Sequence, residues 1–223
     1  MRAVIGRTRT GRRTIKAIEC EKYGPPDVLR AAERAVPVPK SNEIRIKIHS
    51  AVATPSDCAF RRANPFFIRF MYGLRKPKYA VLGVELAGIV DAVGREATRF
   101  KPGDRVFGLS TRSFGAYAEY ICLPEDGLLA KVPSGTSCDE AVGICDGAAT
   151  SLVFLRDVAR IRPGQRALIN GASGAVGIYA VQLAKHYGAE VTGVCSGANA
   201  ELVLWRGHPK RMLTSRPDAK KET

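Results

Sequence analysis

A glycine-rich turn in the second half of the chain is the feature that most constrains the fold. The turn spans residues 171–177 and reads GASGAVG, and a short apolar strand at 166–170 precedes it. Helical character follows over 176–187, and a second strand follows over 190–195. A strand, a turn, a helix and a strand in this order form one βαβ unit with parallel strands and a right-handed crossover. The sequence therefore predicts the start of a doubly wound α/β domain.

The same turn fits the glycine fingerprint of dinucleotide sites. Small residues allow a tight turn, close approach of the backbone to a pyrophosphate, and close packing of the helix on the strand. The N–H groups near the start of the helix would face the phosphates from the positive end of the helix dipole. We predict that the pyrophosphate contacts come from Ala172, Ser173, Gly174, Ala175, Val176 and Gly177. The plainer alternative is a tight turn that binds nothing.

The end of the second strand bears on the choice of cofactor. An NAD site usually carries Asp or Glu about 20 residues after the glycines, where the carboxylate accepts from the ribose 2′-hydroxyl. This chain has Ser196 and Asn199 there instead, and no carboxylate that would repel a 2′-phosphate. The sequence therefore favours NADPH over NADH. Against this, no Lys or Arg stands in the next few positions, and both polar residues could be loop formers only.

The first half of the chain has strand periodicity. Ile44, Ile46 and Ile48 alternate with polar residues over 43–49, as in a half-buried antiparallel strand. Turns rich in Gly, Pro and Asp separate further candidate strands at 15–20, 86–93, 105–109, 115–121 and 128–132. Many short strands with frequent turns indicate a barrel-like β domain over 16–134. The partial α/β domain then covers 135–204, and its segment 138–160 is typical of buried helices.

The positive charge of the chain lies mainly at its two ends. Of the net +14, residues 1–15 contribute five arginines and no acid, and residues 205–223 contribute six bases and two acids. We predict a basic N-terminal extension over 1–15 and a basic, irregular tail over 205–223. A nucleic-acid partner has little support, because its footprint should lie across a folded face.

Two composition features bear on location. No run approaches about 18 apolar residues, and the N-terminus lacks an apolar signal region, so we expect neither a membrane partner nor secretion. The six cysteines contain no C-x-x-C pair, which is typical of reduced thiols. We therefore expect a cytoplasmic protein.

Several motifs in the same order along the chain resemble one family. The stretch 15–204 resembles the medium-chain dehydrogenase/reductases, in their zinc-free quinone oxidoreductase (zeta-crystallin-like) branch. The resemblance rests on YGPPDVL at 23–29, TPSD at 54–57, GVELAGIV at 83–90, FKPGDRV at 100–106 and the segment 164–185. That last segment departs from the branch signature at Ala175, where the signature has Gly.

The resemblance implies a GroES-like β-barrel domain followed by a partial Rossmann domain. It also implies hydride transfer from NADPH to a quinone, an enone or a related carbonyl compound. It places Thr150 near the nicotinamide and Ser196 near the adenosine ribose. Thr54 stands where the branch often has an Asn beside the nicotinamide. No catalytic acid is named, because nothing in the sequence selects among Tyr23, Tyr72, Tyr117 and Tyr120.

The resemblance also addresses zinc. The zinc alcohol dehydrogenases, which the chain also resembles, bind a catalytic zinc through a His in a G-H-E motif, and here Val84 takes that position. Their structural zinc needs four closely spaced cysteines, and this sequence has no such cluster. We therefore expect no zinc, and expect reduction of an already electrophilic substrate.

Other interpretations stay open. Chains of this branch begin near Lys16 and continue well past Leu204, so the chain could be a truncated, weakly active or inactive remnant of such an enzyme. The missing strands would then leave a sheet edge and an apolar face uncovered. A nucleic-acid binder that uses its basic ends is a third hypothesis, and a homodimer is a further open point.

Overall fold

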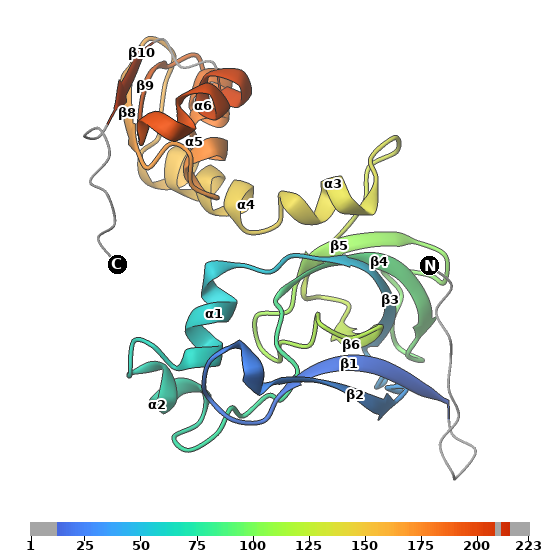
Figure 1. The fold of residues 1–223 in the computed structure, drawn as a ribbon. Helices are drawn as coiled ribbons and strands as arrows, with labels where there is room; N and C mark the ends of the chain where they lie inside the picture. The colour runs from blue at the N-terminus through green and yellow to red at the C-terminus, as the bar shows by residue number, and fades with distance from the viewer. Residues whose placement is uncertain (1–12, 208–210, 215–223) are drawn as a thin grey trace. The chain divides into compact units, whose positions relative to one another are not determined.

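The computed structural model describes residues 13–207 and 211–214. The chain divides into two units, Met1–Cys145 and Asp146–Thr223. Each unit has its own sheet and its own core, as Figure 1 shows. Among the described residues, no helix is both long and apolar enough to cross a membrane.

The first unit is built on a curled, five-stranded antiparallel sheet. The strands lie in the order β6-β3-β4-β5-β7, and the curl is visible in Figure 1. They are β3 (Glu43–Ala51), β4 (Glu85–Val93), β5 (Arg105–Leu109), β6 (Tyr120–Pro124) and β7 (Leu128–Lys131). A separate antiparallel pair joins β1 (Thr14–Cys20) to β2 (Leu29–Ala35).

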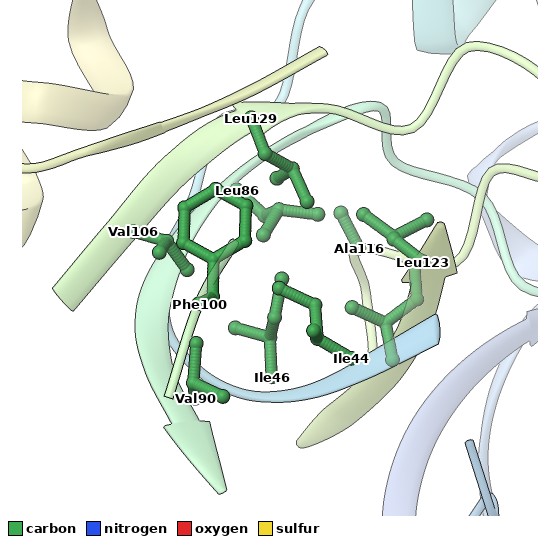
Figure 2. Close-up of a cluster of buried hydrophobic side chains, with 10 residues drawn as sticks. Ile44, Ile46, Leu86, Val90, Phe100, Val106, Ala116, Leu123 and Leu129 are labelled. Carbon is green, nitrogen blue, oxygen red and sulfur yellow. The ribbon is translucent and has the colours of Figure 1, made fainter. Parts of the chain in front are cut away.

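The core of the first unit lies on the concave side of the curled sheet, as Figure 2 shows. Ile44 and Ile46 of β3 are fully buried, which agrees with the alternation in the sequence. They pack with Leu86 and Val90 from β4 and Val106 from β5. This GroES-like arrangement confirms the predicted β domain.

Short helices lie between or after the strands of the first unit. They are η1 (Pro26–Val28), α1 (Pro55–Arg62), α2 (Ile68–Tyr72) and α3 (Cys138–Gly143).

The strand predicted at 115–121 is instead a strand at Tyr120–Pro124. Gly115 has φ 106°, and Ala118 makes only an isolated bridge with Ala17. Residues 115–119 are therefore not part of the strand, which begins at Tyr120.

The second unit contains the predicted βαβ unit. It consists of β8 (Arg166–Asn170), α5 (Gly177–His186) and β9 (Glu190–Cys195), and the two strands are parallel. With β10 (Arg211–Thr214) the sheet order is β10-β9-β8, the first half of a doubly wound sheet. Three further helices belong to this unit: α4 (Gly147–Leu152), the π-helix η2 (Val153–Val158) and α6 (Ala200–Gly207), with a short 3-10 turn η3 (Gly197–Asn199) before α6.

The structure differs from the expectation for the C-terminal end. Irregular chain was predicted from Trp205 onward, but α6 continues to Gly207 and β10 pairs in parallel with β9. The strand was missed because its four residues are too few to carry a periodicity. Residues 215–223, like residues 1–12, lie outside the described part of the chain.

One face of the second unit is open. Within the described ranges, β8 pairs with β9 and has no partner on its other side. Leu168 on that strand and Phe154 near it are each at least 60% exposed. The helices predicted to be buried over 138–160 are therefore buried only in part. The uncovered edge and apolar face agree with the expectation for a sheet of three strands.

Candidate dinucleotide-binding site

The turn between β8 and α5 is held by its glycines. Gly171 has φ 74°, a left-handed conformation that favours glycine. Its carbonyl oxygen accepts from the N–H of Gly174 at 2.9 Å, which closes the turn. A Cβ atom at Gly177 would overlap that same carbonyl oxygen. Only glycine at 177 therefore lets α5 begin this close to the end of β8.

The turn presents backbone donors that the protein leaves unused. Within the described residues, no hydrogen bond occupies the N–H groups of Ser173, Ala175 and Val176. The next donors are committed, since Ile178 donates to Gly174 at 3.0 Å and no side chain caps the start of α5. Free N–H groups at a helix start attract anions, through hydrogen bonds and through the helix dipole.

Helix α4 supports the turn from behind. Ser151 is 1% exposed, and its Oγ lies 2.7 Å from the carbonyl oxygen of Val176 and 2.8 Å from that of Gly147. A Cβ atom at Gly147 would overlap the carbonyl oxygen of Ala175. Gly147 and Ser151 were not predicted from the sequence. The signal was available in the small residues of the segment GAATS, which allow a helix to approach a turn closely.

A second cluster of polar side chains lies where β9 ends. The N–H of Ala172 donates to the carbonyl of Val194 at 2.9 Å, which ties the glycine turn to β9. The Asn199 amide nitrogen lies 3.1 Å from Ser196 Oγ and 3.3 Å from Ser173 Oγ. The side-chain amide of Asn199 thus contacts the hydroxyls of both Ser196 and Ser173. No Asp or Glu occurs in the sequence between the end of β9 and Asn199.

Thr150 lies in the same unit, on α4. It is half-buried, and its hydroxyl is 3.3 Å from a carboxylate oxygen of Asp146. The structure therefore places Thr150, the turn 172–177 and Ser196 in the second unit, whereas Thr54 belongs to the first.

Thr54 caps helix α1. Its hydroxyl accepts from the N–H of Asp57, and Asp57 Oδ2 accepts from the Thr54 backbone at 2.8 Å, so the two form a capping box. The Thr54 hydroxyl also lies 2.8 Å from that carboxylate. Asp57 therefore serves as the second half of the cap of α1.

Tyr117 lies close to this cap. Its hydroxyl donates to the carbonyl of Val52 at 3.2 Å, and a Cβ atom at Gly83 would stand 2.7 Å from its ring. Burial, followed by the neighbouring carboxylate of Asp57, raises the pKa of Tyr117. A phenol that holds its proton so firmly is poorly matched to protonating a substrate near neutral pH.

The other tyrosines give no clearer candidate for a catalytic acid. Tyr23 donates to the carbonyl of Gly73 at 2.7 Å, and burial raises its pKa. Tyr72 packs edge-on against Phe60 and Phe114. Over the described ranges, no group of three or more His, Cys, Asp or Glu side chains could hold a metal ion.

Comparison with known proteins assigns the architecture. Residues 40–134 match the family described as the alcohol dehydrogenase GroES-like domain. The chain is 34% identical over 200 residues to the quinone oxidoreductase of Sus scrofa, and the matched stretch covers 89% of this chain and 58% of that protein.

Solved structures agree with the sequence matches. The quinone oxidoreductase of Escherichia coli, solved in complex with NADPH, matches with a TM-score of 0.76 at 30% identity, over 89% of this chain and 58% of that one. CurK enoyl reductase matches with a TM-score of 0.81 at 25% identity, over 91% of this chain and 60% of that one. The chain thus spans about three-fifths of the length of the proteins that it matches.

The chain resembles the medium-chain dehydrogenase/reductases, because a GroES-like domain is followed by a sheet that corresponds to the first half of a Rossmann domain. Within them, it is similar to the quinone oxidoreductase type, with which it shares about a third of its residues over the matched stretch.

Proposed function

We propose that the chain binds NADPH and belongs to an oxidoreductase that reduces a quinone, an enone or a related carbonyl compound without zinc. The observation that carries the proposal is the set of unused N–H groups at Ser173, Ala175 and Val176, held in place by the contact of Gly177 with Gly171. When bound, the reduced nicotinamide supplies the hydride.

The residues of the second unit take complementary roles in this proposal. The turn from Ala172 to Gly177 binds the pyrophosphate through its backbone. Ser196 and Asn199 bind the adenosine ribose and its 2′-phosphate by hydrogen bonds. Thr150 orients the nicotinamide end, and a role for Thr54, which belongs to the first unit, stays a prediction from the sequence. Support comes from the hydrogen-bonded cluster around Asn199 and from the absence of a carboxylate at the end of β9.

The preference for NADPH over NADH is part of the proposal. A carboxylate in place of Ser196 would accept from a ribose 2′-hydroxyl and repel a 2′-phosphate. Hydroxyl and amide groups instead leave room for a charged phosphate and can donate to it. The E. coli relative was solved with NADPH, which supports the same choice. A small-molecule partner and a cytoplasmic location stay predictions.

A second candidate function is favoured by the open face of the second unit. Since β8 has one strand neighbour within the described ranges and Phe154 and Leu168 are exposed, the chain could be a remnant that binds the cofactor weakly and turns over slowly or not at all.

Two measurements on the full chain distinguish these functions. Calorimetric titration with NADPH and NADH reports binding. The decrease of reduced-nicotinamide absorbance with 1,4-benzoquinone or an aliphatic enone as acceptor reports turnover. The proposed enzyme shows both, with NADPH preferred. Binding without turnover identifies the remnant, and the absence of any binding rejects both.

A further inference from the structure

Helix α2 and its flanking loops carry a group of exposed apolar side chains, which we call the aromatic tip. It consists of Phe66, Phe67, Phe70, Met71 and Leu74, which are 59–69% exposed. Five large apolar side chains within nine residues form one contiguous patch, and patches of this kind on soluble domains usually mark an interaction surface. In Figure 1, α2 lies at the periphery of the first unit, away from the curled sheet.

The aromatic tip is fixed on the unit. Ile68 is 5% exposed, and Tyr72 packs on the small core around Phe114, so one side of α2 is anchored. The Arg69 guanidinium lies 4.8 Å from the ring of Tyr23 and 5.7 Å from that of Phe66. The phenylalanines therefore stand outward on an ordered support, since the interior positions are taken by Ile68 and Tyr72.

The surroundings of the aromatic tip are basic. No Asp or Glu occurs between Cys58 and Val84. Four basic side chains in that segment are exposed and have no ion pair within the described residues: Arg62, Arg75, Lys76 and Lys78. Elsewhere in the unit, exposed bases such as Arg34, Arg95 and Lys131 pair with acidic side chains.

We propose that the aromatic tip docks on an anionic lipid bilayer. Phenylalanine and methionine side chains enter the boundary between headgroups and acyl chains, while Lys and Arg around them meet the lipid phosphates and carboxylates. A bilayer of this kind offers an apolar interior and negative charges together. A protein partner would need acidic side chains as well as an apolar surface, and the tip of a second copy has no acidic side chains to offer. This proposal departs from the sequence-based expectation of no membrane partner, which rested on the lack of a spanning segment, because the contact proposed here is peripheral.

The proposal is independent of the cofactor site, because the aromatic tip belongs to the first unit and Gly171–Gly177 to the second. It goes beyond the proposed function because it locates the protein at a membrane surface. Apolar quinones and enones partition into bilayers, so a reductase held at the surface would meet such substrates at a higher local concentration.

Co-sedimentation of the full chain with lipid vesicles tests the proposal. We expect binding to phosphatidylcholine vesicles that contain about one-third phosphatidylserine, and far weaker binding to phosphatidylcholine alone. The double variant Phe70→Ser/Met71→Ser should lower the partition coefficient at least about tenfold, because two inserted apolar side chains are lost. Its matched control is Val38→Ser/Leu128→Ser, which removes two apolar side chains that are 81% and 61% exposed elsewhere in the same unit.

A second pair of variants tests the charges. Arg75→Gln/Lys76→Gln should lower binding to the anionic vesicles about tenfold or more, since each base near the surface contributes about a fivefold factor. Arg95→Gln/Lys101→Gln removes one exposed Arg and one exposed Lys beyond the end of β4 that is far from the segment 58–84, and should leave binding within about twofold. Circular dichroism verifies the fold of each variant.

Three outcomes would overturn the proposal. Equal binding by Phe70→Ser/Met71→Ser and its control Val38→Ser/Leu128→Ser would place the contact elsewhere, for instance on the arginines of residues 1–12. Equal binding to neutral vesicles would remove the role of charge. A change of oligomeric state in the Phe70→Ser/Met71→Ser variant without vesicles would make the tip a contact between copies of the chain.

Discussion

Gly177 is a residue of the candidate site whose replacement the structure tolerates poorly. A methyl group there would overlap the Gly171 carbonyl oxygen, so Gly177→Ala must shift α5 away from β8. We expect a loss of about 1–3 kcal/mol in the free energy of unfolding of the second unit, as for other overpacked sites. Urea unfolding followed by circular dichroism measures it. Gly197→Ala is the matched control, because no atom lies within 4 Å of its added Cβ.

Ser196 sets the cofactor preference at the same scale. Ser196→Asp places a carboxylate where the 2′-phosphate is proposed to bind, and should weaken NADPH about tenfold or more while NADH is affected less. In Ser196→Asn the new side chain has nearly the size of aspartate but no charge, so this variant should keep the preference for NADPH over NADH. Calorimetric titrations of both variants with both cofactors provide the comparison, and an unchanged ratio in Ser196→Asp would contradict the assignment.

Asp104 predicts a small pH dependence. The hydrogen bond from Lys131 Nζ at 2.8 Å, together with the N–H of Lys101 at 3.0 Å, lowers the pKa of Asp104. Because the folded-state pKa lies below the unfolded value of about 4, the pair stabilises the fold above that value and is lost as the pH falls through the folded pKa. Lys131 is 57% exposed, so the contribution is at most about 1 kcal/mol.

Asp104→Asn checks the sign of this effect. The variant should be less stable than the parent near neutral pH, and the difference should shrink to nothing in acid. Denaturant unfolding at several pH values measures it. A difference that grows on acidification would be the wrong sign for a lowered pKa.

At the scale of elements, the cap of α1 is a stabilising feature with a distinct test. Thr54→Ala removes the side-chain half of the capping box and should cost about 1 kcal/mol. Thr54→Asn should cost much less, since Asn is an equally good cap and is the residue that the family often has there. Equal losses for both variants would show that the hydroxyl contributes through contacts other than the cap.

Three elements show what can and cannot be predicted from the sequence. The βαβ unit was predictable because glycines, a helical period and two strands agree over 166–195. Helix α1 was missed, although Thr54-Pro55 followed by Asp57 carries a cap, a proline at the first helical position and a capping box. Strand β2 was missed because LRAAERA is rich in helix formers, and only its pairing with β1 makes it a strand.

The candidate site was predictable in part for a similar reason. The turn 172–177 and Ser196 stand in a local pattern, so their positions could be expected from the sequence. Gly147 and Ser151 reach the turn from a helix about 25 residues earlier, and no local pattern reports such a contact. The link between Ser173 and Asn199 likewise depends on how β8 and β9 pair.

At the scale of the whole molecule, the open edge of β8 predicts self-association. The outer edge of β8 has no strand partner within the described ranges, and beside the exposed Phe154 and Leu168 it is a template for pairing with another chain. Leu168→Lys should shift the chain toward the monomer in sedimentation velocity runs, because a charge on the edge face opposes pairing. Val38→Lys is the control in the first unit, because Val38 is an exposed apolar side chain that belongs neither to this edge nor to the aromatic tip.

The measurement that tests the central claim most directly is a thermal melt of the full chain with and without NADPH, for the parent, Ala175→Asp and Ala175→Asn. Ala175 is exposed and its N–H is unused, so either side chain fits, but only the aspartate repels a pyrophosphate. At a hundredfold excess over Kd, NADPH should stabilise the parent and Ala175→Asn by about 2.7 kcal/mol. Ala175→Asp should melt normally and show little shift. Equal shifts in all three chains, or no shift in the parent, would contradict a dinucleotide site at this turn.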